Sequence, residues 1–233
     1  MKIIGVLGGS SDQATADYYR RLNAAANARL GGINTAEVLI SSMNFRRASE
    51  AIRGGRWEEM GAYLADRAQA LEAAGAKILL CVSNSLHRLA PVFTRGLTIP
   101  FLHIVDPTAQ AIRARGLRRA AFVGTKAAMS GADLRTRYAE QFGVKLVVPP
   151  GNVQDELDRI IFDELCAAQC RPESKRYVLD VASRMQREGA ECFILGCTEL
   201  PLLVGQSDMP QLPMFDTAGL HVEAAMDLAL RDD

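Results

Sequence analysis

The sequence predicts an α/β fold of two pseudo-symmetric α/β domains, with parallel sheets, helices on both faces of each sheet, and the active site in the cleft between the domains. Two observations predict it. Short apolar runs alternate with amphipathic stretches along the 233 residues, which is typical of buried parallel strands joined by crossover helices. In addition, one helix–turn–strand–loop segment occurs twice, which indicates a duplicated α/β unit.

The individual elements follow from the spacing of apolar residues. Runs of about four or five residues, partly β-branched and followed by Gly, Ser, Asn or Pro, predict strands at residues 3–7, 37–41, 77–81, 101–105, 120–123, 145–148 and 192–195. Apolar residues repeating every three or four positions predict helices at residues 15–30, 57–74, 107–115, 132–142, 153–168, 173–188 and 217–231.

The internal repeat aligns LEAAGAKILLCVSNS (residues 71–85) with MQREGAECFILGCTE (residues 185–199). Each copy is a helix, a Gly-Ala turn, a buried strand and a polar loop. At this offset of 114 residues, Ser83 is equivalent to Cys197. Ligands of doubly wound sheets bind at the carboxyl ends of strands, so we expect these two positions on opposite walls of the cleft.

The repeat also sets the expected domain boundaries. The first domain is predicted to comprise residues 1–99 together with a returning C-terminal helix in residues 207–233. The second is predicted to comprise residues 100–206. A weaker second repeat relates IIGVLGGSSDQAT near the start to RAAFVGTKAAMSG at residues 119–131, and each is a strand, a glycine and a hydroxyl-rich loop.

Charge and composition exclude several classes of function. The chain has 27 Lys and Arg and 27 Asp and Glu, so no net field favours nucleic acid or an anionic membrane. It has no apolar run of 18 residues and no secretion signal, from which we expect a cytoplasmic protein. Five cysteines and three histidines, in spacings unlike zinc motifs, predict neither a disulfide framework nor a metal site.

Two equivalent loops, each with one proton-transfer group, suit the racemisation of a carbon acid. One base cannot easily reach both faces of a carbon, whereas one deprotonated and one protonated group can. Cys197 is the predicted main acid/base, because a thiol ionises near pH 8.5, and Ser83 is its predicted partner. Polar groups of the loops that include Ser10, Ser11 and Thr125 can stabilise the carbanion.

Several segments, in order along the chain, resemble the aspartate/glutamate racemase family of the Asp/Glu/hydantoin racemase superfamily. They are GVLGGSSDQATADYY, CVSNSLH, ILGCTELPLL and LPMFDTAGLHVEAA. The resemblance implies a cofactor-independent isomerase that acts on an amino acid without pyridoxal phosphate or metal. It also implies a homodimer, with no nucleic-acid or membrane partner.

Single positions carry over from the family's motifs. Cys197 matches the second catalytic cysteine, and Thr198 matches the neighbour that contacts the substrate carboxylate. His87 matches the histidine that closes the first loop, with a supporting role. The remaining substrate-binding positions implied by the resemblance are Asn84, Ser85 and Thr125.

The chain departs from the family pattern at two further positions that bear on the chemistry. Ser83 stands where many members have the first catalytic cysteine, and Cys81, inside the predicted strand, should not replace it. We therefore expect an asymmetric enzyme that works faster when Cys197 removes the proton. Cys166 stands where some aspartate racemases have a carboxylate-binding lysine, so a substrate carboxylate is assigned to Arg47 or its neighbour Arg46.

Other functions on the same scaffold remain open at this point. One active cysteine with a non-acidic partner also suits a one-cysteine isomerase, decarboxylase or hydantoin-racemase-type enzyme. A non-catalytic small-molecule sensor would bind the same ligands without exchanging their α-proton.

Overall fold

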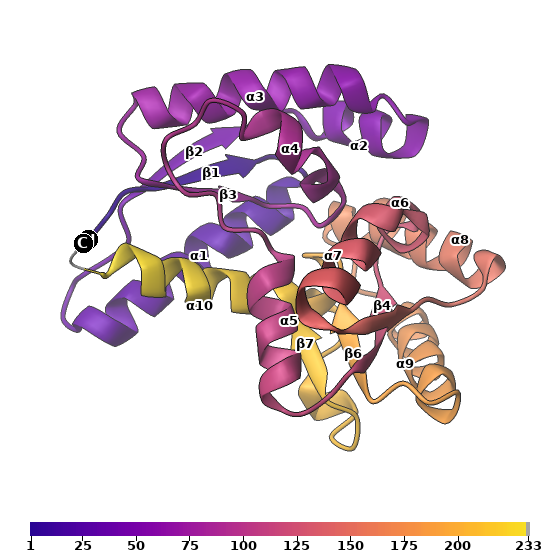
Figure 1. Cartoon of the computed structure of the whole chain (residues 1–233). Coiled ribbons are helices and arrows are strands. Elements are labelled where there is room, and N and C mark those ends of the chain that lie inside the picture. Colours follow the sequence, from indigo (N-terminus) through magenta and orange to yellow (C-terminus); the bar gives the residue numbers. More distant parts are fainter. Residues whose placement is uncertain (232–233) are drawn as a thin grey trace. The chain divides into compact units, whose positions relative to one another are not determined.

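The computed structural model describes residues 1–231 and divides the chain into two compact units (Figure 1). The first unit comprises Met1–Ile104 and the chain from Ala218 onward, and the second comprises Val105–Thr217. Each unit contains one sheet whose neighbouring strands are all parallel, with helices around it. The predicted α/β class with parallel sheets is thus confirmed.

The sheet of the first unit has the strand order β2-β1-β3. Its strands are β1 (Ile4–Gly8), β2 (Val38–Ser42) and β3 (Ile78–Cys81). Every residue of β1 and β3 is buried, as expected for strands covered on both faces, whereas the edge strand β2 is partly exposed.

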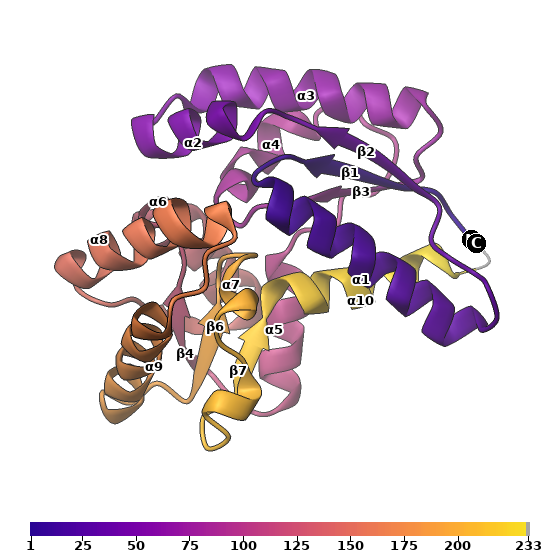
Figure 2. The same cartoon turned by 180° about the vertical axis from the view of Figure 1, so that it is seen from behind.

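Helices cover both faces of this sheet (Figure 2). Helices α1 (Asp12–Leu30) and α10 (Thr217–Ala229) lie on one face, and their Tyr18 and Val222 share one apolar core with alternate residues of β1 and β3. Helix α3 (Trp57–Ala73) covers the other face. The remaining elements of the unit are α2 (Phe45–Gly54), a 3₁₀ turn (Ser85–Leu89) and α4 (Ala90–Phe93).

The second unit repeats this order and adds a strand, giving β5-β4-β6-β7. The strands are β4 (Arg119–Val123), β5 (Lys145–Val147), β6 (Cys192–Leu195) and β7 (Met214–Asp216). β3 and β6 are separated by the same 114 residues as Ser83 and Cys197. They occupy equivalent places beside β1 and β4, so the sequence repeat corresponds to a structural repeat.

Helices also flank the second sheet. Helices α5 (Val105–Ala114) and α7 (Ala132–Phe142) pack together on one face, and α9 (Pro172–Arg187) lies on the other (Figures 1 and 2). The short elements are α6 (Lys126–Ser130), α8 (Gly151–Arg159), a π-helical turn (Ile160–Glu164), and 3₁₀ turns at Leu165–Ala167, Leu200–Leu202 and Gln206–Asp208.

Three expectations differ from the structure. The strand predicted at residues 101–105 is wrong, because only Phe101 pairs there, with Leu79, and Val105 already begins α5. The helix predicted at residues 153–168 is broken by the π-helical turn and then by a 3₁₀ turn. The second unit continues to Thr217, beyond the boundary expected at residue 206, because the unexpected strand β7 hydrogen-bonds to β6.

Candidate active site

In the first unit, the loop after β1 presents two buried hydroxyl groups. Ser11 caps α1, and its Oγ accepts a hydrogen bond from Ala14 N at 3.1 Å. Thr15 Oγ1 accepts from Gly9 N at 2.8 Å and donates to Ser11 O at 2.7 Å, which fixes the loop. Within the described residues, the buried Oγ of Ser10 has no hydrogen-bond partner, so it is available to a ligand.

Gly9 permits this loop conformation. Its φ is +83°, and a Cβ at this position would lie 2.1 Å from the carbonyl oxygen of Met43. Any side chain would therefore push the β1 loop away from the chain that follows β2. Met43, which directly precedes the N-cap Asn44 of α2, donates from its backbone N to Gly8 O at 3.1 Å.

The loop after β3 is buried and tightly held. Ser83, Asn84 and Ser85 are between 3% and 6% exposed. Ser83 Oγ accepts from Leu86 N at 3.4 Å. His87 Nδ1 lies 2.7 Å from the Ser83 carbonyl oxygen, and His87 Nε2 accepts from Ile104 N at 3.1 Å. The structure therefore places His87 against the main chain of this loop and of Ile104.

Cys81 lies at the end of β3, fully buried, two residues before Ser83. Burial raises the pKa of its thiol to about 12. A thiol that stays protonated over the physiological range is a poor base. This agrees with the expectation that Cys81 does not replace the missing first cysteine.

The arginines after β2 line a pocket of about 290 Å³ at the beginning of α2 and α3. Arg46 is paired with Glu50 at 2.8 Å. Arg47 lies over the ring of Tyr63, 4.4 Å from its centroid, with only a long 3.5 Å ion pair to Glu59. The ring of Tyr63 holds the Arg47 guanidinium in place, and the long ion pair to Glu59 engages few of its N–H donors. Arg47 is therefore a better candidate than Arg46 to bind a ligand carboxylate.

In the second unit, the loops after β4 and β6 carry the predicted residues. Thr125 caps α6, with its Oγ1 accepting from Ala128 N at 3.2 Å, and is 6% exposed. Gly196 precedes Cys197, and a Cβ on it would lie 2.2 Å from Phe122 of β4. The sheet therefore accepts only glycine there, which fixes the start of the Cys197 loop.

Cys197 lies against a buried carboxylate. Its Sγ donates to Glu199 Oε2 at 2.8 Å, and Thr198 Oγ1 donates to the same oxygen at 2.9 Å. Cys166 Sγ lies 3.7 Å from the other oxygen, Oε1. Glu199 is only 2% exposed. One carboxylate thus contacts two thiols and a hydroxyl, although these residues are separated by up to 33 positions in the chain.

This environment keeps Cys197 protonated at rest. Burial raises the pKa of its thiol well above the ordinary value, and the negative charge of Glu199 raises it further. The thiol can therefore act as a base only after it has passed its proton to an acceptor. Glu199 Oε2, at 2.8 Å, is the acceptor in place.

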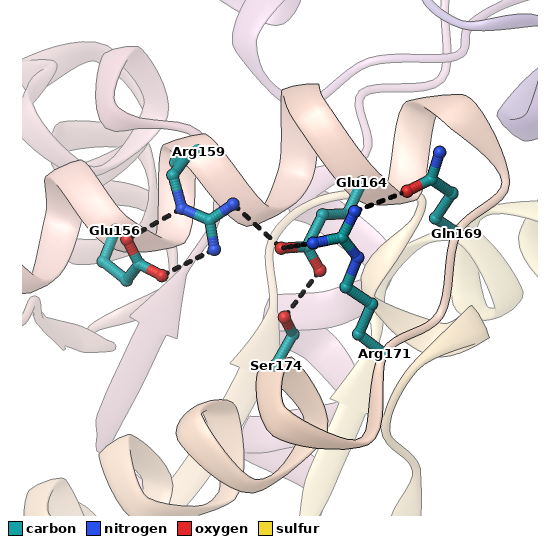
Figure 3. A network of polar contacts seen from close by, with 6 residues as sticks. All are labelled: Glu156, Arg159, Glu164, Gln169, Arg171 and Ser174. Atoms are coloured by element: carbon teal, nitrogen blue, oxygen red, sulfur yellow. Dashed lines mark hydrogen bonds and ion pairs between the residues drawn. The ribbon is translucent and has the colours of Figure 1, made fainter.

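A polar network holds the chain that carries Cys166 (Figure 3). Glu164, 1% exposed, accepts from Ser174 Oγ at 2.6 Å and forms an ion pair with Arg159 at 2.9 Å. Arg159 also holds both carboxylate oxygens of Glu156. The network anchors the π-helical turn on the first turn of α9, and Cys166 follows two residues later.

Sequence reasoning missed Glu199 as a functional candidate, although it lies inside the GCTELP motif. The available signal was an acidic residue followed by Leu-Pro in the loop after a buried strand. Cys166, which stands where some aspartate racemases have a lysine, contacts this carboxylate. Among residues 1–231, no group of three or more His, Cys, Asp or Glu could hold a metal ion, and no helix is long and apolar enough to cross a membrane.

Comparisons with known proteins find a matching family model, a related sequence and similar structures. A family model described as Asp/Glu/Hydantoin racemase matches residues 4–225. A glutamate racemase from Roseiflexus sp. (strain RS-1) is 29% identical over 154 residues, which cover 64% of this chain and about half, 54%, of that relative.

Two crystal structures are similar over nearly the whole chain. One, from Yersinia pestis, is provisionally described as an Asp/Glu racemase. It is 32% identical, with a TM-score of 0.89, and the alignment covers 99% of this chain and 100% of that one. The other is an aspartate racemase homologue from Pyrococcus horikoshii OT3. It is 33% identical, with a TM-score of 0.83 and the same coverage.

Proposed function

We propose, given that the chain belongs to the Asp/Glu/hydantoin racemase family, that it is an amino-acid racemase of the aspartate/glutamate type that needs no cofactor. The observation that carries the proposal is the 2.8 Å hydrogen bond from the Cys197 thiol to the buried Glu199 carboxylate. A thiol with a base in direct contact can both remove and return a proton.

The proposed reaction begins on the Cys197 side. The thiol passes its proton to Glu199 Oε2, and the resulting thiolate removes the substrate's α-proton. Cys197 is then a thiol again, and the substrate is a carbanion. The Ser83 hydroxyl protonates this carbanion to give the other enantiomer, and the proton held by Glu199 returns to Ser83 through water, so the protons balance.

Ser83 fits the role of proton donor better than that of base. Its Oγ accepts a hydrogen bond from Leu86 N, which stabilises negative charge on the oxygen after the proton has left. The bond is long, at 3.4 Å, so this stabilisation is modest. We therefore propose that Ser83 removes the α-proton more slowly than Cys197 does, which slows α-proton exchange of one enantiomer, while kcat/KM for interconversion is equal in both directions.

The remaining polar groups are proposed to hold the substrate. The unpaired Ser10 hydroxyl lies just before the N-cap of α1, where helix N–H groups attract anions, and suits the α-carboxylate. Arg47 suits a side-chain carboxylate. The resemblance assigns Thr198 to the substrate carboxylate; because its hydroxyl donates to Glu199 here, we propose that its lone pairs accept from the substrate ammonium instead. Asn84, Ser85 and Thr125 are proposed to complete the set.

The test is α-proton exchange in D₂O, followed by proton NMR without added cofactor. The substrates are both enantiomers of aspartate, of glutamate and of a panel of other amino acids. We expect loss of the α-proton signal and appearance of the opposite enantiomer, and we expect both to disappear in Cys197→Ala. Cys170→Ala, at an exposed thiol, is the matched control and should retain activity.

The outcomes separate the related functions. Exchange without inversion would contradict racemisation and support a one-base enzyme that uses Cys197 alone. Absence of exchange with every amino acid would contradict the proposal and leave the decarboxylase or sensor as alternatives. A trapped covalent adduct on Cys197 would indicate nucleophilic attack instead of proton transfer.

A further inference from the structure

His87 makes hydrogen bonds with two backbone groups from different parts of the first unit. The imidazole is 1% exposed. Its Nδ1 lies 2.7 Å from the carbonyl oxygen of Ser83, and its Nε2 lies 3.1 Å from the backbone N–H of Ile104. Ile104 is the last residue of the chain's first segment in this unit.

These partners determine where the imidazole carries its proton. A carbonyl oxygen only accepts hydrogen bonds, so Nδ1 must carry the hydrogen that is donated to Ser83. A backbone N–H only donates, so Nε2 must be bare to accept from Ile104. His87 is therefore neutral and in the Nδ1–H form, since a second proton on Nε2 would point at the N–H of Ile104.

Packing holds the ring in this orientation. The ring centroid of His87 lies 5.3 Å from that of Phe101, 4.6 Å from that of His103 and 5.9 Å from that of His221. His221 is itself held, with Nδ1 3.0 Å from Tyr18 Oη and Nε2 2.9 Å from the carbonyl oxygen of Leu102. The ring therefore has little freedom to rotate and exchange its partners.

We propose that His87 is a positioning residue that aims the Ser83 hydroxyl, by clamping the Ser83 carbonyl to the peptide of Ile104. The carbonyl and hydroxyl of Ser83 belong to one residue at the end of β3, so fixing the carbonyl limits the directions in which the hydroxyl points. This inference rests on the proposed function for its effect on catalysis, whereas the clamp itself does not.

Two amide replacements of His87 should each keep one of its two backbone hydrogen bonds and remove the other. In His87→Asn, the amide N–H occupies about the place of Nδ1 and can still donate to Ser83. In His87→Gln, the amide oxygen reaches about the place of Nε2 and can still accept from Ile104, but the donor to Ser83 is lost. The readout is α-proton exchange of each enantiomer separately, with the thermal unfolding midpoint as a folding control.

We expect His87→Gln to slow exchange of the enantiomer that depends on Ser83 by about tenfold, the usual effect of losing one buried hydrogen bond. Exchange of the enantiomer that depends on Cys197 should be unchanged, and His87→Asn should restore most of the loss. Equal slowing of both enantiomers in both variants would show a merely structural role and overturn the proposal.

A double variant tests whether His87 acts through Ser83. In the Ser83→Ala background only the exchange that depends on Cys197 remains, and His87→Gln should leave it unchanged, because the group that His87 positions is absent. A tenfold loss of this remaining exchange would overturn the proposal, since His87 would then act on another group.

A measurement independent of activity tests the clamp. The chain has three histidines, so nitrogen-15 NMR of the imidazoles of the full chain gives three sets of signals, each assignable by single replacement. We expect His87 to show a protonated Nδ1 and a bare Nε2 at neutral pH. The opposite pattern would overturn the inference even if racemisation were established, and the expected pattern would stand even if racemisation were not found.

Discussion

Replacing Glu199 with Gln separates the two roles of this carboxylate, as a base for Cys197 and as a structural acceptor. Gln keeps the size and one oxygen, which can still accept from Cys197 Sγ and Thr198 Oγ1, now 2.8 and 2.9 Å from Oε2. Each hydrogen bond weakens from roughly 1.5–3 to roughly 0.5–1.5 kcal/mol when the acceptor loses its charge. This loss is offset because folding no longer has to remove a charged carboxylate from water. We expect the unfolding free energy to stay within about 1 kcal/mol of the parent value.

Catalysis and thiol reactivity should then change in opposite directions. Without the base, Cys197-dependent α-proton exchange should fall by about 10²–10⁴-fold, or roughly 3–5 kcal/mol in the barrier. The pKa of Cys197 is raised first by burial and then by the charge of Glu199. Removing the charge should lower this pKa, so a larger fraction is thiolate at a given pH and the thiol should be alkylated faster.

The two effects are measured on the same protein. Exchange is followed in D₂O, and iodoacetamide labelling of Cys197 is followed by peptide mass spectrometry, which separates it from the exposed Cys170. Glu173→Gln, at an exposed carboxylate 3.8 Å from Arg176, is the matched control and should change neither rate. Parental exchange in Glu199→Gln would refute the base role, and slower alkylation would refute the electrostatic explanation of the protonated thiol.

Three further predictions follow from single contacts. Ser83→Ala should abolish α-proton exchange of the enantiomer that depends on Ser83 and leave exchange without inversion for the enantiomer that depends on Cys197. The rate of interconversion must fall equally in both directions, because enantiomers in water have equal free energy. Arg47→Ala should raise KM for a dicarboxylate by about 10- to 100-fold in steady-state assays, whereas Arg46→Ala, whose guanidinium pairs with Glu50, should stay within about twofold. Burial raises the pKa of Cys81 to about 12, so from about pH 9 to pH 12 the unfolded chain releases a proton that the folded chain keeps. Stability should therefore fall by up to about 1.4 kcal/mol per pH unit for this thiol, and urea unfolding of Cys81→Ala at several pH values should lack that contribution.

Features that depend on local pattern are predictable from the sequence. β3 and β6 are continuous apolar runs before polar loops, and the 114-residue repeat aligns them, so the sequence alone predicts Ser83 and Cys197 at equivalent strand ends. Caps at Ser11 and Thr125 are likewise local, because a hydroxyl before a helix accepts from the N–H groups of the first turn. These features need no knowledge of which segments meet.

The remaining features depend on tertiary contacts. Residues 101–105 are as apolar as a strand, but they pair only at Phe101 before α5 begins, and a short apolar run cannot distinguish these states. The contact of Cys166 with Glu199 joins residues 33 positions apart through a π-helical turn, which no apolar periodicity reports. Arg46 pairs with Glu50 one turn later in the same helix, whereas the contacts of Arg47 depend on where α3 places Glu59 and Tyr63. Sequence alone therefore left the two arginines equivalent.

The two loops differ in how they are prepared for proton transfer, and this difference bears on the proposed asymmetry. Cys197 has a buried carboxylate of its own loop at 2.8 Å, so it can be deprotonated where it lies. Ser83 has a backbone N–H on its oxygen, and its supporting residue His87 is already committed to two backbone groups, so that imidazole cannot take the serine's proton in this arrangement. The carboxylate in contact with Cys197 and the backbone N–H in contact with Ser83 support the proposal that Cys197 removes the proton and Ser83 supplies one.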